Sequence, residues 1–224
     1  MTFWRQALEI TRVDLVVERR SGDTLTITLP FAVVALMVFP LAQGTNLGLV
    51  SSMASGLFWA VGILFGMQIA LRGTAADTLN RRDLQMLVGL DPAARFVGRV
   101  ISGTVLTVVF LVVLEVAAVI LLSPELPAGA FAALALVTPL VAIGLAELGT
   151  LAGDVTSGLR NRSALAALIV APLALPIVIG ASQSIEAVVQ DTGILVWILL
   201  LLASDLALAV VGVALAGPLE EATR

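Results

Sequence analysis

The sequence contains no cysteine, histidine, tyrosine or lysine among its 224 residues. Without cysteine the chain can form no disulfide and no thiolate metal site, and without histidine it also lacks the other common ligand of zinc and haem. The absence of lysine excludes a Walker A loop, whose lysine reaches the nucleotide phosphates. Serine hydrolysis with a histidine base is excluded as well. We therefore expect a non-catalytic chain that itself binds no ATP, metal or haem.

Charged residues are scarce, at 12% of the chain, whereas 59% of residues are hydrophobic and the mean hydropathy is +1.09. A soluble domain carries about twice that charged fraction, so the sequence predicts an integral membrane protein. Six apolar stretches each approach the ~20 residues that cross a bilayer, and they should be helices because hydrocarbon tolerates no unpaired backbone groups. The expected fold is an all-α membrane protein with a six-span permease domain at 25–216, with spans at 25–42, 53–71, 97–122, 129–152, 164–182 and 193–216.

The arginines indicate how these spans are oriented. Six spans place residues 1–24, the loops 72–96 and 153–163, and the tail 217–224 on one side of the membrane. All twelve basic residues lie there, counting Arg99 at the membrane edge, and the short opposite loops carry only acids. The positive-inside rule then predicts that both termini are cytoplasmic. Short outer loops favour a pore or permease over a receptor.

Residues 1–24 have the pattern of an amphipathic helix. We expect it to lie in the membrane interface, with its apolar stripe in the acyl boundary. The alternative is a helix packed against the protein itself. The apolar stripe comprises Phe3, Trp4, Ala7, Leu8, Thr11 and Leu15, and the opposite face carries Arg5, Glu9, Arg12 and Arg19.

The loop at 72–96 is the longest polar interruption inside the chain. It has room for a short amphipathic helix that ends near Gly89, and Asp91 followed by Pro92 is typical of the start of a new helix. Such a structured connector suggests a cytoplasmic coupling helix that docks on a separate ATPase, although a solvated connector remains the alternative. The candidate contact residues are Arg81, Arg82, Asp83, Leu84, Met86, Leu87 and Leu90.

Three carboxylic acids lie inside the predicted spans: Glu115, Glu147 and Asp205. An unpaired carboxylate in hydrocarbon costs at least about 2.5 kcal/mol, so each should face the bundle, be protonated or find a partner. They could form a proton or cation relay, or they could hydrogen-bond neighbouring helices or a subunit interface. Glu147 lies near the cytoplasmic end of its span, where we expect its side chain to be accessible to water.

Prolines, glycines and methionines in the spans have simpler interpretations. Pro172 and Pro176 predict a kink, which is either a packing feature or a flexible helix beside a pathway. The glycines fit close helix approach, and the methionines are expected to pack rather than to ligate haem. These residues are Gly144, Gly149 and Gly153, and Met37, Met53 and Met67.

In order and spacing, six sequence pieces resemble the CcmB family, the haem exporter protein B of cytochrome c maturation, over nearly the full chain. They are "WRQALEITRVDLVVERRSG", "LPFAVVALMVFPLA", "LFWAVGILFGMQIAL", "DLQMLVGLDPAARFVGRV", "TPLVAIGLAELGTLAGDVTSGLRNRSAL" and "APLALPIVIGA". The chain departs from the family pattern in a less acidic loop, with Arg81 and Arg82, and in the place of Asp154. These departures bear on the residues that contact the ATPase.

The resemblance implies an ABC-type complex with an ATPase subunit (CcmA), a haem-handling membrane protein (CcmC), a small helper (CcmD) and a haem chaperone (CcmE). ATP hydrolysis in the partner would drive haem export, or release of the haem-loaded chaperone at the outer face. The other subunits are then expected to ligate the haem. A homodimer is expected, because six spans make half of a typical ABC permease pathway, and no nucleic-acid partner is indicated.

Other functions stay open at the level of sequence. An ABC-2-type exporter subunit for a lipid, a drug or a polysaccharide would share the interfacial helix, the spans and the coupling loop. A proton-coupled secondary transporter would use Glu115 and Asp205 and would need no ATPase. An intramembrane enzyme would need a metal site made of carboxylates alone, from acids in scattered spans.

Overall fold

The computed structural model describes residues 2–43, 47–75, 89–122, 127–156 and 162–222. Over these ranges the chain folds into seven helices, six of which are long and apolar enough to cross a membrane. This confirms the predicted all-α, six-span fold. The helices are α1 (Phe3–Ser21), α2 (Asp23–Gln43), α3 (Leu47–Ala75), α5 (Pro92–Leu122), α6 (Ala128–Val155), α7 (Arg162–Val189) and α8 (Leu195–Ala222).

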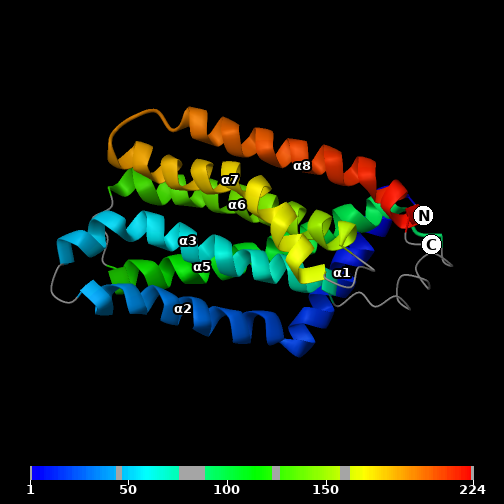
Figure 1. The fold of residues 1–224 in the computed structure, drawn as a ribbon, viewed down its shortest axis with the longest axis horizontal. Coiled ribbons are helices and arrows are strands. Elements are labelled where there is room, and N and C mark those ends of the chain that lie inside the picture. Colours follow the sequence, from blue (N-terminus) through cyan, green and yellow to red (C-terminus); the bar gives the residue numbers. More distant parts are fainter. Residues whose placement is uncertain (1, 44–46, 76–88, 123–126, 157–161, 223–224) are drawn as a thin grey trace.

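Six of the helices run roughly side by side along the long axis, and α1 lies obliquely across one end of the bundle (Figure 1). Both termini lie at that same end, as an even number of spans requires. Helices α5 and α6 pack against each other and connect most of the bundle, because α5 also contacts α1, α2, α3 and α8, and α6 also contacts α3, α7 and α8. Helices α3 and α6 bury the largest share of their spans, and α2 buries the smallest.

The ends of several helices differ from the predicted spans. The apolar stretches Leu25–Ala42 and Met53–Leu71 coincide with the prediction, but the stretch predicted from residue 97 begins five residues earlier, at Pro92. Helix α7 continues to Val189, so the first seven residues of the predicted outer connection at 183–192 are helical. Hydropathy ends a span at the first polar residues, whereas a helix continues beyond the hydrocarbon as long as its backbone bonds can form.

Glycines allow α6 to approach its neighbours closely, as predicted. A Cβ atom on Gly149 would lie 2.4 Å from the Cβ of Ala70 in α3, and one on Gly144 would lie 2.8 Å from Ile177 in α7. Every residue from 144 to 154 is buried. The half of α6 nearest the termini is therefore enclosed by other helices on all sides.

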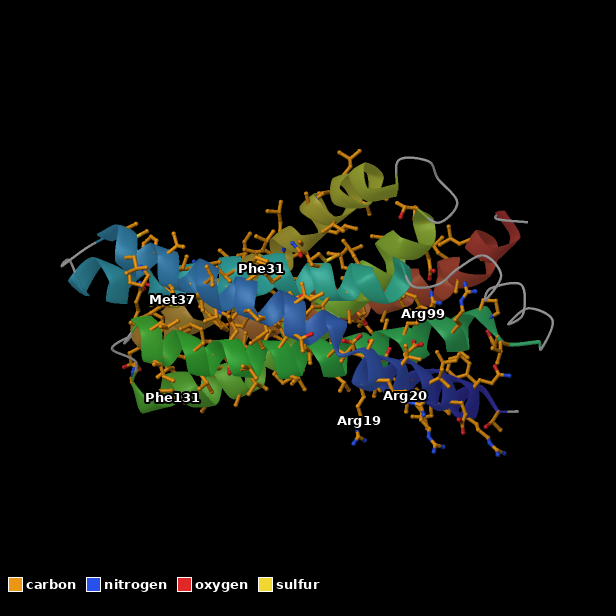
Figure 2. All side chains as sticks on the ribbon, turned by 90° about the horizontal axis from the view of Figure 1, so that it is seen from below. Arg19, Arg20, Phe31, Met37, Arg99 and Phe131 are labelled. Atoms are coloured by element: carbon orange, nitrogen blue, oxygen red, sulfur yellow. The ribbon has the colours of Figure 1, made fainter. Side chains whose placement is uncertain are left out.

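The methionines differ from the packing prediction. Met67 is buried in the core, but Met37 and Met53 are 40% and 51% exposed on the outside of the bundle. Met37 and Phe31 mark the outer face of α2 in Figure 2, and Phe131 lies on α6. In a membrane protein such apolar side chains face lipid, where packing against protein is not needed.

Candidate functional site

The first turns of α5 follow directly on the predicted coupling segment, and their sequence explains why the helix begins there. The Asp91 side chain caps the helix by accepting a hydrogen bond from the N–H of Ala93 at 2.9 Å, and Pro92 occupies the first helical position. The N–H of Asp91 in turn donates to Oε1 of Gln6 in α1, at 3.1 Å. Asp91 therefore both starts α5 and ties it to the N-terminal helix, which confirms the predicted helix start.

Helix α1 packs against α5 at Gly98. The Thr11 hydroxyl donates to the Gly98 carbonyl at 2.9 Å, and a Cβ on Gly98 would lie 2.7 Å from the Ala7 carbonyl oxygen. Ala7 and Thr11 are buried in this contact, so their assignment to a membrane-facing stripe is wrong. Trp4 and Leu8 remain 65% and 58% exposed. The helix thus packs on the protein with one face and leaves an apolar flank for the membrane interface.

An ion pair joins α5 to α6 about two turns beyond the Asp91 cap. Arg99 Nη1 lies 3.6 Å from Asp154 Oδ1, and both side chains are only 8% exposed. Arg99, which was expected at the membrane edge, is enclosed by protein, and Arg95 beside it is buried too. The arginines Arg19, Arg20 and Arg99 all lie in the half of the molecule that carries α1 (Figure 2).

The same turns of α5 contact α8 through Phe96. A Cβ on Gly212 of α8 would lie 2.0 Å from Cζ of the Phe96 ring, so only glycine leaves room for this side chain. The base of α5, defined as residues 91–99, is therefore fixed to α1, α6 and α8 at once. Movement of this base would be passed to three other helices, because close-packed contacts of this kind transmit displacement.

The predicted coupling residues lie just before this base. Arg81, Arg82, Asp83, Leu84, Met86 and Leu87 lie outside the described residues. Leu90 is half-buried, and Gly89 has a φ of 71°, the left-handed backbone that a helix end commonly requires. Sequence analysis missed Arg99 and Asp154 as a pair. The available signal was a lone acid, Asp154, on the arginine-rich side of the membrane.

Glu147 and Asp205 face each other across the contact of α6 and α8. They are 5% and 7% exposed, and a Cβ on Gly144, one turn from Glu147, would lie 2.6 Å from Asp205 Oδ1. The prediction that Glu147 is wetted is therefore wrong, because α8 covers it. The two carboxylates are close enough to repel each other when both are charged. Within the described part of the chain, both Asp205 oxygens and Glu147 Oε2 are buried without a hydrogen-bond partner.

Glu115 occupies a different environment, in the half of the bundle opposite the termini. Its Oε1 accepts a hydrogen bond from the Thr138 hydroxyl of α6. The acid also lines a pocket with a volume of about 40 Å³ between α3, α5, α6 and α7. The three intramembrane acids thus divide into a facing pair and a separate residue, so the structure does not join them into one relay.

Pro172 and Pro176 lie within one continuous helix, α7, and the kink predicted at them stays a prediction. Within the described ranges, no three histidine, cysteine, aspartate or glutamate side chains are grouped so that they could hold a metal ion. That the chain binds no cofactor stays a prediction.

Comparisons with known proteins agree with the resemblance drawn from the motifs. The family profile described as "CcmB protein" matches residues 5–221. The protein named heme exporter protein B from Haemophilus influenzae is 29% identical over 181 residues, which cover 80% of this chain and 81% of that protein. The match includes at least part of each of the seven described helices.

Proposed function

Because the chain belongs to the CcmB family, we propose that it is the permease subunit of an ABC-type complex in cytochrome c maturation. In this complex a separate ATPase subunit hydrolyses ATP at the cytoplasmic face. The hydrolysis drives haem export, or release of a haem-loaded chaperone, at the outer face. The chain would sit in the bacterial inner membrane with both termini cytoplasmic, and would function as a homodimer.

The observation that carries this proposal is the anchoring of the α5 base. It follows the predicted coupling segment in the chain and holds α1 through Gly98, α6 through Asp154 and α8 through Gly212. A displacement of the coupling segment by an ATPase would therefore also displace α1, α6 and α8. All three helices contact α5 within its first two turns. The lack of lysine also supports the proposal. Because the chain has no Walker A loop, the ATP would have to be bound by another subunit.

The family profile and the haem exporter relative favour a function in haem export over the export of a lipid, drug or polysaccharide. The partners proposed are the ATPase, a haem-handling membrane protein, a small helper and the haem chaperone. Haem would be held by those partners, since this chain offers neither histidine nor cysteine as an axial ligand.

Purification of the membrane complex through a tag on this chain tests the proposal. The ATPase subunit should co-purify with the natural chain and with the conservative variant Leu87→Met, and should be lost with Leu87→Asp. If the Leu87→Asp variant retains the ATPase, the ATPase contacts a different part of the chain. An isolated chain that transports its substrate on an ion gradient, with no response to nucleotide, would refute the proposal and favour a secondary transporter.

A further inference from the structure

Glu147 and Asp205 form a buried pair of acids between α6 and α8, to which the proposed ATPase coupling gives no role. The carboxylate of Asp205 points at the backbone of α6, because a Cβ on Gly144 would lie 2.6 Å from its Oδ1. Gly144 and Glu147 are three residues apart, so they lie on the same face of α6. Glycine at position 144 therefore leaves room for an acid from α8 beside the face that carries Glu147.

The surroundings of the pair offer its oxygen atoms no hydrogen-bond donor within the described part of the chain. Both oxygens of Asp205 and Oε2 of Glu147 are buried without a partner there. At this level α6 packs against small or apolar residues of three further helices, which are Gly66 and Ala70 of α3, Gly103 of α5 and Ile177 of α7. Buried polar groups without a partner are rare in folded proteins, so the two acids must satisfy each other.

The other described charges on the helices around the pair lie at other levels of the bundle. Arg99 of α5 lies beside Asp154, which follows Glu147 by about 10 Å along α6. Glu115 of α5 contacts Thr138, which precedes Glu147 by about 13 Å. The remaining charged residues of α3, α5, α7 and α8 lie in the first or last turns of these helices: Arg72, Arg95, Arg162, Glu186, Glu220 and Glu221. Among the described residues, the two acids are therefore the charged groups that face each other at this level.

The chemistry of two facing carboxyl groups defines what joins them. Ionised carboxylates only accept hydrogen bonds, so two of them repel each other, whereas a protonated carboxyl has one O–H to donate. A metal ion such as Ca²⁺ would need about six to eight oxygen ligands. Within the described ranges no three possible ligands are grouped, and Ile177 closes the space beside Gly144. A proton needs neither a cavity nor a third ligand.

We propose that Glu147 and Asp205 form a proton-binding site that keeps one proton at neutral pH. The proton comes from water, is bound to one carboxyl group and is donated to the other as a hydrogen bond. The pair then carries one negative charge instead of two, and the hydrogen bond holds α8 to α6. This proposal does not depend on the proposed function, because it concerns the folded chain alone and can be tested without the ATPase.

The composition of the chain makes such a proton measurable. Ordinary aspartate and glutamate side chains lose their protons near about pH 4, and arginine keeps its proton above about pH 12. The chain has no histidine, cysteine, tyrosine or lysine. Between about pH 6 and 11, the groups that exchange protons are therefore the terminal amino group and any acid in an unusual environment.

The pH dependence of unfolding counts the protons that the pair keeps. The equilibrium constant for unfolding of the full-length chain is measured in mixed micelles from about pH 6 upward, in the natural chain and in Glu147→Gln/Asp205→Asn. The unfolded chain has lost these protons, so a folded pair that keeps one makes the natural chain less stable as the pH rises. Its unfolding constant should rise about tenfold per pH unit relative to the double variant, until the folded pair loses its proton.

The matched control is Glu186→Gln/Asp191→Asn, which makes the same two replacements at exposed positions. This variant should follow the natural chain at every pH. A constant ratio between the natural chain and Glu147→Gln/Asp205→Asn would show that the pair keeps no proton and would overturn the proposal. A rise of about a hundredfold per pH unit would show that each acid keeps its own proton, and would overturn the sharing.

Infrared difference spectra give a second measurement, which needs no unfolding. The C=O stretch of a protonated carboxyl group lies well above the bands of an ionised carboxylate. At neutral pH in D₂O, the natural chain minus Glu147→Gln/Asp205→Asn should show one protonated and one ionised group, and Glu115 cancels because both chains contain it. The control difference with Glu186→Gln/Asp191→Asn should show ionised groups alone. Ionised groups alone in the first spectrum, or protonated groups alone, would overturn the shared proton.

Circular dichroism and gel filtration show whether each variant folds. Should the double variant fail to fold, Glu147→Gln and Asp205→Asn are measured singly, since each amide supplies an N–H donor in place of the bound proton. The proton count should then fall to zero in at least one of the two variants. A count that stays at one in both would show that neither acid needs the other, and would overturn the shared site.

Discussion

Breaking the buried pair of Arg99 and Asp154 should destabilise the bundle strongly. At an effective dielectric constant of about 20, unit charges 3.6 Å apart attract each other by about 4.6 kcal/mol. Because each side chain is only 8% exposed, water screens this attraction weakly. Asp154→Asn removes the charge that lies beside the enclosed guanidinium of Arg99, and loss of one member of a buried ion pair typically costs about 3–5 kcal/mol.

The measurement is the free energy of unfolding in mixed micelles, as dodecyl sulfate is increased and helix content is followed. The matched control is Asp191→Asn, which changes an exposed acid in the α7–α8 turn and should alter stability by less than about 0.5 kcal/mol. The charge exchange Arg99→Asp/Asp154→Arg should recover part of the loss. Equal stability of Asp154→Asn and Asp191→Asn would refute the inference that this pair holds α5 to α6.

A variant of the same ion pair can distinguish binding of the ATPase from transmission of its motion in the assembled complex. If the α5 base passes ATPase motion to α6, Asp154→Asn should leave the ATPase bound but lower the ATP-dependent activity of the complex. The charge exchange should raise that activity again. Full activity in a folded Asp154→Asn complex would show that the ion pair lies outside the transmission path.

Gly98→Val should push α1 away from α5, because the new side chain would meet the Ala7 carbonyl, and it should cost roughly 1–3 kcal/mol. Trypsin should then cleave at the arginines of α1 faster than in the natural chain, whereas Gly217→Ala, where nothing lies within 4 Å, should change nothing. Asp205→Asn removes a buried carboxylate that faces Glu147, so stability should stay equal or rise and ATP-driven activity should persist. Loss of activity with unchanged stability would instead favour a proton-coupled role for the pair.

Local chemistry accounts for what sequence reasoning predicted well. Hydropathy located the spans Leu25–Ala42 and Met53–Leu71, whose ends are polar or glycine-rich. The Asp91–Pro92 start of α5 followed from capping rules alone, because those interactions join residues within one turn. Each of these features depends on neighbours in the chain.

Features that depend on distant segments were not predictable in the same way. Arg99 was expected at the membrane edge, and only the fold shows that it is enclosed and forms an ion pair with Asp154 of α6. Glu147 was expected to be wetted, because its sequence position does not reveal that α8 covers it. The pocket at Glu115 combines residues of four helices, and no single stretch of sequence contains its pattern.

The contact between Thr11 and Gly98 joins residues 87 positions apart, and this separation constrains the order in which the protein can be assembled. While the ribosome is still making α2 and α3, the surface that receives α1 has not been synthesised. During that interval the N-terminal helix must lie somewhere other than on α5. Its exposed Trp4 and Leu8 would allow it to bind the bilayer surface. Helix α1 would then dock on α5 only after the third span has been inserted into the membrane.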